Sequence, residues 1–266
     1  MENLELPLVI FTILTQMAVG MAIFTAVRQW KTVEGYSLKT RNEWIAILGL
    51  VVVAVLAAFF HLGKPLGFFR MLINLQTAWL SREILAFGLF GALTAVCFYT
   101  VFSKAANGWL FKLTALVGLL AVFSTGMAYA SAGLDAIHNI LPLTFFFLTA
   151  LTLGSAAASF FVDESAHGML RSVLEPSLLV SLVVRMIIPF AWISGSTVMA
   201  QTGYNFLASP FHWLHMLILL GGFVVLRRVK GIPSWLPFLL IVGELLGRLA
   251  FFALMVSSGA NLGGLY

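Results

Sequence analysis

Residues 44–61, WIAILGLVVVAVLAAFFH, decide the fold class of this 266-residue chain. Apart from Gly49 and the closing His61, every residue in the stretch is apolar. A helix of about 20 such residues crosses the hydrocarbon core of a bilayer. The stretch is too long and too uniformly apolar for the alternating strands of an outer-membrane barrel. It therefore predicts an all-α, polytopic membrane protein.

The rest of the chain repeats this pattern. Hydrophobic residues make up 61% of the chain and charged residues 9%, whereas soluble domains carry about 25% charged residues. We therefore interpret the net charge of +5 as basic cytoplasmic loops and expect no binding of nucleic acid. Apolar stretches predict one integral-membrane domain, residues 1–266, with eight transmembrane helices near 6–28, 42–63, 83–103, 108–130, 141–162, 173–199, 212–228 and 236–258.

The distribution of basic residues predicts the orientation in the membrane. Eight spans place both termini on one side, and most Lys and Arg residues fall in the loops of the other side. The face with the termini carries only Lys64, Arg70 and Arg82, all between the second and third spans. By the positive-inside rule both termini are expected on the periplasmic side of a bacterial inner membrane. The segment MENLELP lacks the basic start of a secretory signal, so we expect the first apolar run to remain as a span.

Two ionisable residues mark the hairpin FFHLGKPLGFFRMLINLQTAWLSRE, residues 59–83. His61 closes the second span and Glu83 opens the third, so an antiparallel hairpin brings both to one membrane level. Ionisable residues at that depth are functional candidates, and this pair could accept the two protons that a quinol releases on oxidation. The alternative is an interfacial histidine together with a Glu83 that pairs with Arg82 or Arg70. The residues alone leave the two interpretations evenly balanced.

The segment between this pair adds further candidates. Its glycines and proline end a helix and turn the chain. We expect a short interfacial helix afterwards, with Phe69, Leu72 and Trp79 toward lipid or pocket, although Trp79 also suits an aromatic belt. The predicted quinol pocket therefore includes, besides His61 and Glu83, the residues Gly63, Pro65, Trp79, Ser81 and Arg82.

The metal-binding residue types are too few or wrongly placed for most redox centres. The single cysteine, Cys97, excludes a disulfide, a cysteine-ligated iron–sulfur cluster and a thiolate zinc site within the chain. No histidine lies in the middle of a span, which excludes a two-haem cytochrome b; one haem near the outer face is a minor alternative. His212 and His215 are spaced i, i+3 and are expected as interfacial histidines at a helix start. We expect no metal site.

A few polar residues lie within the spans. Glu244 precedes Arg248 by four residues in the last span, the favourable order for an intrahelical pair. Mutual neutralisation of this intramembrane pair is favoured over a proton route. Arg185 lies in the sixth span, where Pro189 predicts a kink, and Gln16 in the first span suits a hydrogen bond between helices.

Four segments resemble a known family. PLVIFTILTQMAVG at the start, HLGKP after the second span, SREI at the third and GELLGRLAFF in the last are similar to the DmsC-type membrane anchor of dimethyl sulfoxide reductase-like molybdoenzymes. The resemblance covers essentially the whole chain, and its implications follow from the family rather than from composition or spacing.

The resemblance implies an anchor without haem or iron–sulfur cluster that oxidises menaquinol in the inner membrane. Its partners would be a four-cluster iron–sulfur subunit and a molybdopterin catalytic subunit, so terminal reduction would not occur in this chain. It also implies that His61 and Glu83 belong to the quinol site. A polysulfide or nitrite reductase-type anchor is the alternative, and a secondary transporter, which would show broken helices with midplane polar residues, is less favoured.

Overall fold

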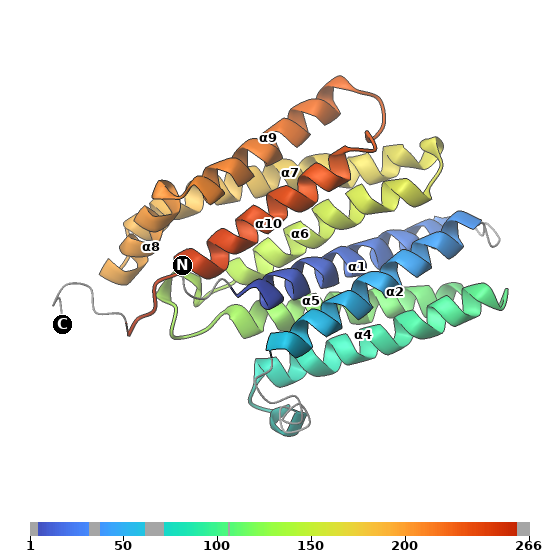
Figure 1. The fold of residues 1–266 in the computed structure, drawn as a ribbon, viewed down its shortest axis with the longest axis horizontal. Helices are drawn as coiled ribbons and strands as arrows, with labels where there is room; N and C mark the ends of the chain where they lie inside the picture. The colour runs from blue at the N-terminus through green and yellow to red at the C-terminus, as the bar shows by residue number, and fades with distance from the viewer. Residues whose placement is uncertain (1–4, 32–37, 62–71, 106, 260–266) are drawn as a thin grey trace.

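The computed structural model describes residues 5–31, 38–61, 72–105 and 107–259, and these residues form a helical bundle without strands (Figure 1). Within these described ranges, eight helices are long and apolar enough to cross a membrane, which agrees with the predicted number of spans. They are α1 (Leu6–Lys31), α2 (Leu38–His61), α4 (Trp79–Phe102), α5 (Gly108–Tyr129), α6 (Leu141–Ala158), α7 (Glu164–Ile193), α9 (Pro210–Arg228) and α10 (Leu236–Leu254). Short 3-10 turns lie at Leu72–Asn74, Asp135–Ile137 and Ser159–Phe161.

The sixth span differs from its predicted range of 173–199. Helix α7 begins nine residues earlier, at Glu164, and ends at Ile193. A separate helix, α8 (Thr197–Ala208), then follows and was not predicted. The Ser196 side chain accepts a hydrogen bond from the Met199 N–H at 3.3 Å and so caps the new helix. With 12 residues, α8 is too short to cross the membrane.

Helix α1 begins and helix α10 ends at the same end of the bundle, as Figure 1 shows. We call this the terminal end. Helices α2 and α5 finish there, α4, α6 and α9 begin there, and α8 lies there as well. The turns between α4 and α5, α6 and α7, and α9 and α10 lie at the opposite end. The assignment of the terminal end to the periplasm remains a prediction.

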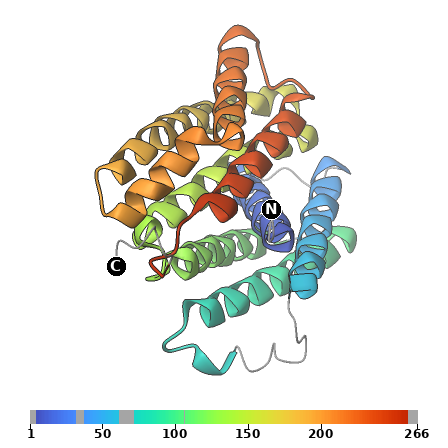
Figure 2. The ribbon, with the colours of Figure 1, turned by 60° about the vertical axis from the view of Figure 1, so that its left-hand side comes forward.

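Helix α1 lies at the centre of the bundle. It contacts α2, α5, α6 and α10, and Figure 2 shows it between the α2, α4 and α5 group and the remaining long helices. Its contact with α6 is very close: a Cβ atom on Gly20 would lie 2.0 Å from the Ala150 carbonyl oxygen, and one on Gly154 would lie 2.4 Å from the Gly20 Cα. Small residues allow this approach, which supplies the packing that holds membrane helices together.

Candidate functional site

Glu83 lies one turn into α4, near the terminal end, and only 4% of its surface is exposed. Because α4 and α5 are antiparallel and in contact, the first turns of α4 meet the last turns of α5. The Thr125 side chain of α5 is a hydrogen-bonding neighbour of the Glu83 carboxyl. Tyr129, at the end of α5, lies within electrostatic range of the same carboxyl. The predicted proton acceptor is therefore a buried carboxyl beside polar groups.

The histidine of the predicted pair is placed only in part. Helix α2 ends at His61 and packs against α4, so the His61 backbone lies at the terminal end, as the hairpin prediction requires. The His61 side chain lies outside the described residues, as do Gly63, Pro65 and Arg70. The predicted interfacial helix is described only from Leu72 onward, where a 3-10 turn precedes α4.

Arg82 does not neutralise Glu83. Its Nε donates to the Leu75 carbonyl oxygen at 2.9 Å and its Nη2 donates to the Gln76 carbonyl oxygen at 2.6 Å. Its guanidinium carbon also lies 4.3 Å from the centre of the Trp79 ring. The alternative in which Arg82 pairs with Glu83 is therefore wrong, because loop carbonyls and an aromatic face occupy the guanidinium instead.

The other predicted pocket residues line the first turn of α4. Ser81 is buried, with 3% of its surface exposed. The Trp79 ring packs edge-on against Phe123 of α5, with ring centres 5.8 Å apart and an interplanar angle of 72°. Trp79 thus faces a neighbouring helix as well as the Arg82 side chain.

A second set of polar side chains lies between α7, α9 and α10. Nη2 of Arg185 lies 3.5 Å from Oε2 of Glu244, and Nε2 of His215 lies 3.6 Å from Oε1 of the same carboxyl. All three side chains are at least nine-tenths buried. The three residues lie at a similar level of the bundle. Glu244 is in the middle of α10, Arg185 is eight residues before the end of α7, and His215 is five residues after the start of α9.

Glu244 and Arg248, the predicted intramembrane pair, meet through α6. The Thr149 hydroxyl donates to Glu244 Oε2 at 2.8 Å, and Arg248 Nη2 donates to the Thr149 hydroxyl oxygen at 3.3 Å. The same Arg248 nitrogen donates to Gln16 Oε1 at 2.7 Å, so the predicted bond of Gln16 between helices is present. Sequence spacing located both charges but did not indicate that Thr149 joins them.

His212 and His215 lie in the first two turns of α9, as expected for histidines at a helix start. They are 4% and 1% exposed, so both are buried inside the bundle. Helix α8, absent from the prediction, covers the start of α9: the Phe206 ring centre lies 5.7 Å from that of His212. Their i, i+3 spacing places both side chains on one face of α9, where both line a cavity. This spacing was the signal that could have identified the site.

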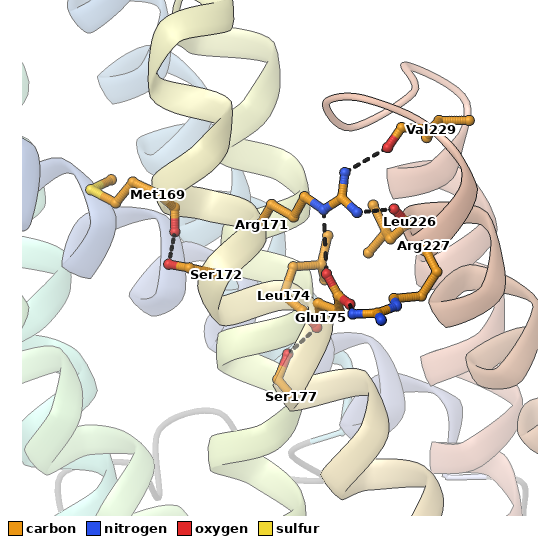
Figure 3. Close-up of polar contacts among 9 residues, drawn as sticks. All are labelled: Met169, Arg171, Ser172, Leu174, Glu175, Ser177, Leu226, Arg227 and Val229. Carbon is orange, nitrogen blue, oxygen red and sulfur yellow. Dashed lines mark hydrogen bonds and ion pairs between the residues drawn. The ribbon is translucent and has the colours of Figure 1, made fainter.

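At the opposite end, a polar cluster fastens α7 to α9 (Figure 3). Arg171 donates to the Val229 carbonyl oxygen at 2.5 Å and to the Leu226 carbonyl oxygen, which are free acceptors at the end of α9. Glu175 lies between Arg171 and Arg227, at 3.3 and 2.9 Å. This cluster ties two helices together far from the terminal end.

Metal ligands do not gather in the described part of the chain. Among residues 5–31, 38–61, 72–105 and 107–259, no three His, Cys, Asp or Glu side chains are placed to hold a metal ion. Cys97 is buried, and its sulfur lies 3.1 Å from the Thr114 hydroxyl oxygen.

Comparison with known proteins agrees with this arrangement. The family model for the DMSO reductase anchor subunit (DmsC) matches residues 1–254. The protein is 30% identical to the C subunit of the anaerobic dimethyl sulfoxide reductase of Haemophilus influenzae over 164 residues, which cover 59% of this protein and 57% of that relative. It is 26% identical to the YnfH subunit of an anaerobic dimethyl sulfoxide reductase of Escherichia coli over 280 positions, which cover 98% of each protein.

The family match and the bundle describe one kind of protein. Eight apolar helices and an anchor family define a multi-pass protein of the bacterial inner membrane. The match extends from the first residue to the end of α10, so it includes the hairpin, the buried Glu83 and the polar network of α10. The chain belongs to the DmsC family of DMSO reductase anchor subunits.

Proposed function

We propose that this chain binds and oxidises menaquinol at the terminal end of the bundle and passes the electrons to an iron–sulfur partner. The observation that carries the proposal is the buried carboxyl of Glu83, one turn inside α4 and without an ion pair to Arg82. A buried carboxyl beside Thr125 is a suitable acceptor for a proton from a quinol hydroxyl. His61, at the end of the adjacent α2, is the proposed acceptor of the second proton.

The surroundings of Glu83 suit an apolar ligand that enters from the bilayer. Leu80 and Leu85 on α4 are 50% and 41% exposed, so the helix presents apolar side chains to lipid next to the carboxyl. Trp79 supplies an aromatic ring one turn earlier. Gly63, Pro65, Ser81 and Arg82 are proposed to shape the pocket, with Arg82 holding the loop through its carbonyls.

The proposed complex divides the chemistry among subunits. The family and both relatives carry the name of dimethyl sulfoxide reductase, so we propose a four-cluster iron–sulfur subunit and a molybdopterin catalytic subunit as partners. Quinol gives up two electrons and two protons. The protons pass to Glu83 and His61, the electrons pass singly to the partner's nearest cluster, and terminal reduction takes place in the catalytic subunit. No haem or cluster is proposed within this chain.

Replacement of the buried carboxyl tests the site. In the complete complex, Glu83→Gln keeps the shape of the side chain but removes its ability to accept a proton. We expect menaquinol-dependent turnover to fall at least tenfold, which corresponds to about 1.4 kcal/mol or more of barrier. Turnover driven by reduced viologen, which delivers electrons directly to the partner subunits, should not change.

Glu175→Gln is the matched control, since it removes a carboxylate from the same bundle at the opposite end. It should retain wild-type quinol turnover. His61→Leu should resemble Glu83→Gln. Wild-type quinol oxidation by both the Glu83 and the His61 variants would show that the quinol site lies elsewhere.

A further inference from the structure

The cavity between α7, α8, α9 and α10 is separate from the proposed quinol site. Its polar lining consists of Arg185, His212 and His215, and its apolar lining includes Trp192 and Phe206. It lies toward the terminal end, where α7 finishes and α9 begins. Every one of these five side chains is buried. These five side chains therefore face the space from within the bundle.

Polar atoms without hydrogen-bond partners converge on this space. Nε of Arg185, Nε2 of His212 and Nε2 of His215 are buried and make no hydrogen bond to the protein. Oε1 of Glu244 makes none either, but it does not line the cavity and lies 3.6 Å from Nε2 of His215. Buried polar atoms without partners are unfavourable, so native proteins satisfy them, often with ordered water. Unpartnered nitrogen atoms on three residues that line one cavity, Arg185, His212 and His215, indicate a bound polar ligand of the size of water.

The charges around the cavity extend into the bundle as a series of contacts. Nε2 of His215 lies 3.6 Å from Oε1 of Glu244. The other oxygen of that carboxylate, Oε2, lies 2.8 Å from the Thr149 hydroxyl, which lies 3.3 Å from Nη2 of Arg248. α7 adds the charge of Arg185, whereas α8 contributes no charged residue. Towards the terminal end the series finishes at His212, which lies two residues from the start of α9.

We propose that this cavity binds water and that the water, together with His212 and His215, forms a proton path between Glu244 and the terminal end of the bundle. Each step moves one proton from an N–H or O–H donor to a free lone pair on the next group. Glu244 is the inner end of the path, because Thr149 and Arg248 beyond it act as donors, so a proton that Glu244 takes up leaves through the same groups. Water bridges the two histidine rings. After a proton has passed, the water molecule and the donor groups turn back, so that each group again points its hydrogen as it did at the start. Arg185 and Arg248 carry charge that holds the Glu244 carboxylate in place and are positioning residues.

Packed side chains connect the proton path with the proposed quinol site. Tyr129, at the end of α5, packs against Phe146 with ring centres 5.4 Å apart, and the guanidinium carbon of Arg248 lies 4.1 Å from the centre of the same Phe146 ring. Use of the path during quinol oxidation therefore rests on the proposed function, whereas the presence of water in the cavity does not.

Radiolytic hydroxyl-radical labelling of the intact complex in membranes tests for the water. Bound water generates radicals in place, so Trp192 is expected to oxidise at least tenfold faster than Phe90, which is also buried but does not line the cavity. Ala250 also lines the cavity, and Ala250→Val should fill the space and lower the labelling of Trp192 severalfold. Equal labelling of Trp192 and Phe90 in the wild type would overturn the proposal.

Kinetics of the complete complex test the proton path. His212→Phe keeps the ring among the aromatic side chains but removes both nitrogens, and His215→Gln keeps a polar contact for Glu244. We expect both variants to lower menaquinol-dependent turnover about fivefold and to increase its solvent deuterium isotope effect. Viologen-driven turnover should be unchanged. Arg227→Gln, at the other end of α9, is the matched control and should behave as the wild type.

The outcomes separate the two proposals. If Glu83→Gln is inactive while both histidine variants keep wild-type turnover and isotope effect, the proton path is refuted and the proposed function stands. If Glu83→Gln itself oxidises quinol normally, the proposed function fails, and the labelling of Trp192 alone decides whether the cavity binds water.

Discussion

At the scale of single residues, Thr149 is the uncharged group that touches both charged residues of α10. Its hydroxyl donates to Glu244 and accepts from Arg248, and the side chain is fully buried. In a bilayer no water reaches such groups from the lipid, so the loss of one partner leaves charged atoms without compensation. The stability of the network therefore depends on one small side chain.

Thr149→Val is expected to lower the free energy of unfolding by about 1–3 kcal/mol, because it preserves volume but removes the bridging hydroxyl. The measurement is the denaturant or thermal midpoint of the purified complex in detergent. Thr144→Val is the control on the same helix, since the Thr144 hydroxyl bonds only its own helix, to the Ile140 carbonyl. Equal midpoints for the two variants would show that the bridge contributes nothing.

The site residues show what a single sequence can predict. The sequence placed Glu83 at the start of the third span but left a quinol-site carboxyl and an interfacial ion pair evenly balanced; in the structure Glu83 lies one turn into α4 and is buried. The pairing of charges could not be predicted in the same way: Arg82 turns to the carbonyls of Leu75 and Gln76, and Glu244 meets Arg185 from another helix. Both of these pairings depend on how distant segments of the chain pack together, and the spacing of residues along one helix gives no information about that packing.

At the scale of elements, the long helices were predictable because each is an apolar run of bilayer length. Helix α8 was missed because 12 residues with Gln201 and Asn205 among them give no transmembrane signal. The start of α7 was missed because Glu164, His167 and Arg171 interrupt the apolar pattern before residue 173. Arg171 pairs with Glu175, which also pairs with Arg227. The missed helix packs against His212. Because α8 was not predicted, the burial of His212 was not predicted either.

The contact of α1 with α6 gives a prediction at this scale. Gly154→Leu places a bulky side chain where even a Cβ atom would lie 2.4 Å from the Gly20 Cα. Overpacking costs about 1–3 kcal/mol in ordinary cores, and here the backbone itself blocks the added atoms. We expect a severalfold loss of folded protein, measured as the monodisperse peak in size-exclusion chromatography from detergent.

Gly49→Leu is the control for that substitution, because a Cβ atom at Gly49 meets nothing within 4 Å. It should leave the chromatographic peak close to that of the wild type. A Gly154→Leu protein as abundant and monodisperse as the Gly49→Leu protein would contradict a tight contact between α1 and α6.

At the scale of the whole molecule, the orientation in the membrane is open to a direct test. Cys97 is fully buried, so a cysteine introduced at an exposed position is the expected target of a thiol reagent. Ser257 lies at the terminal end and Ser234 in the turn before α10 at the opposite end, and both are exposed. In intact spheroplasts, an impermeant maleimide should label Ser257→Cys and not Ser234→Cys. The reverse pattern would place the termini in the cytoplasm.

The bond between Gln16 and Arg248 spans nearly the whole sequence, since it joins the first helix to the last. A ribosome adds about 5–20 residues per second, so the amide of α1 enters the membrane on the order of 10–50 s before its partner is made. During that interval the Gln16 amide of α1 lies in the membrane without the Arg248 guanidinium that donates to it in the folded bundle. Biogenesis is thus ordered by this contact: the bundle can close around its polar centre only when the final helix arrives.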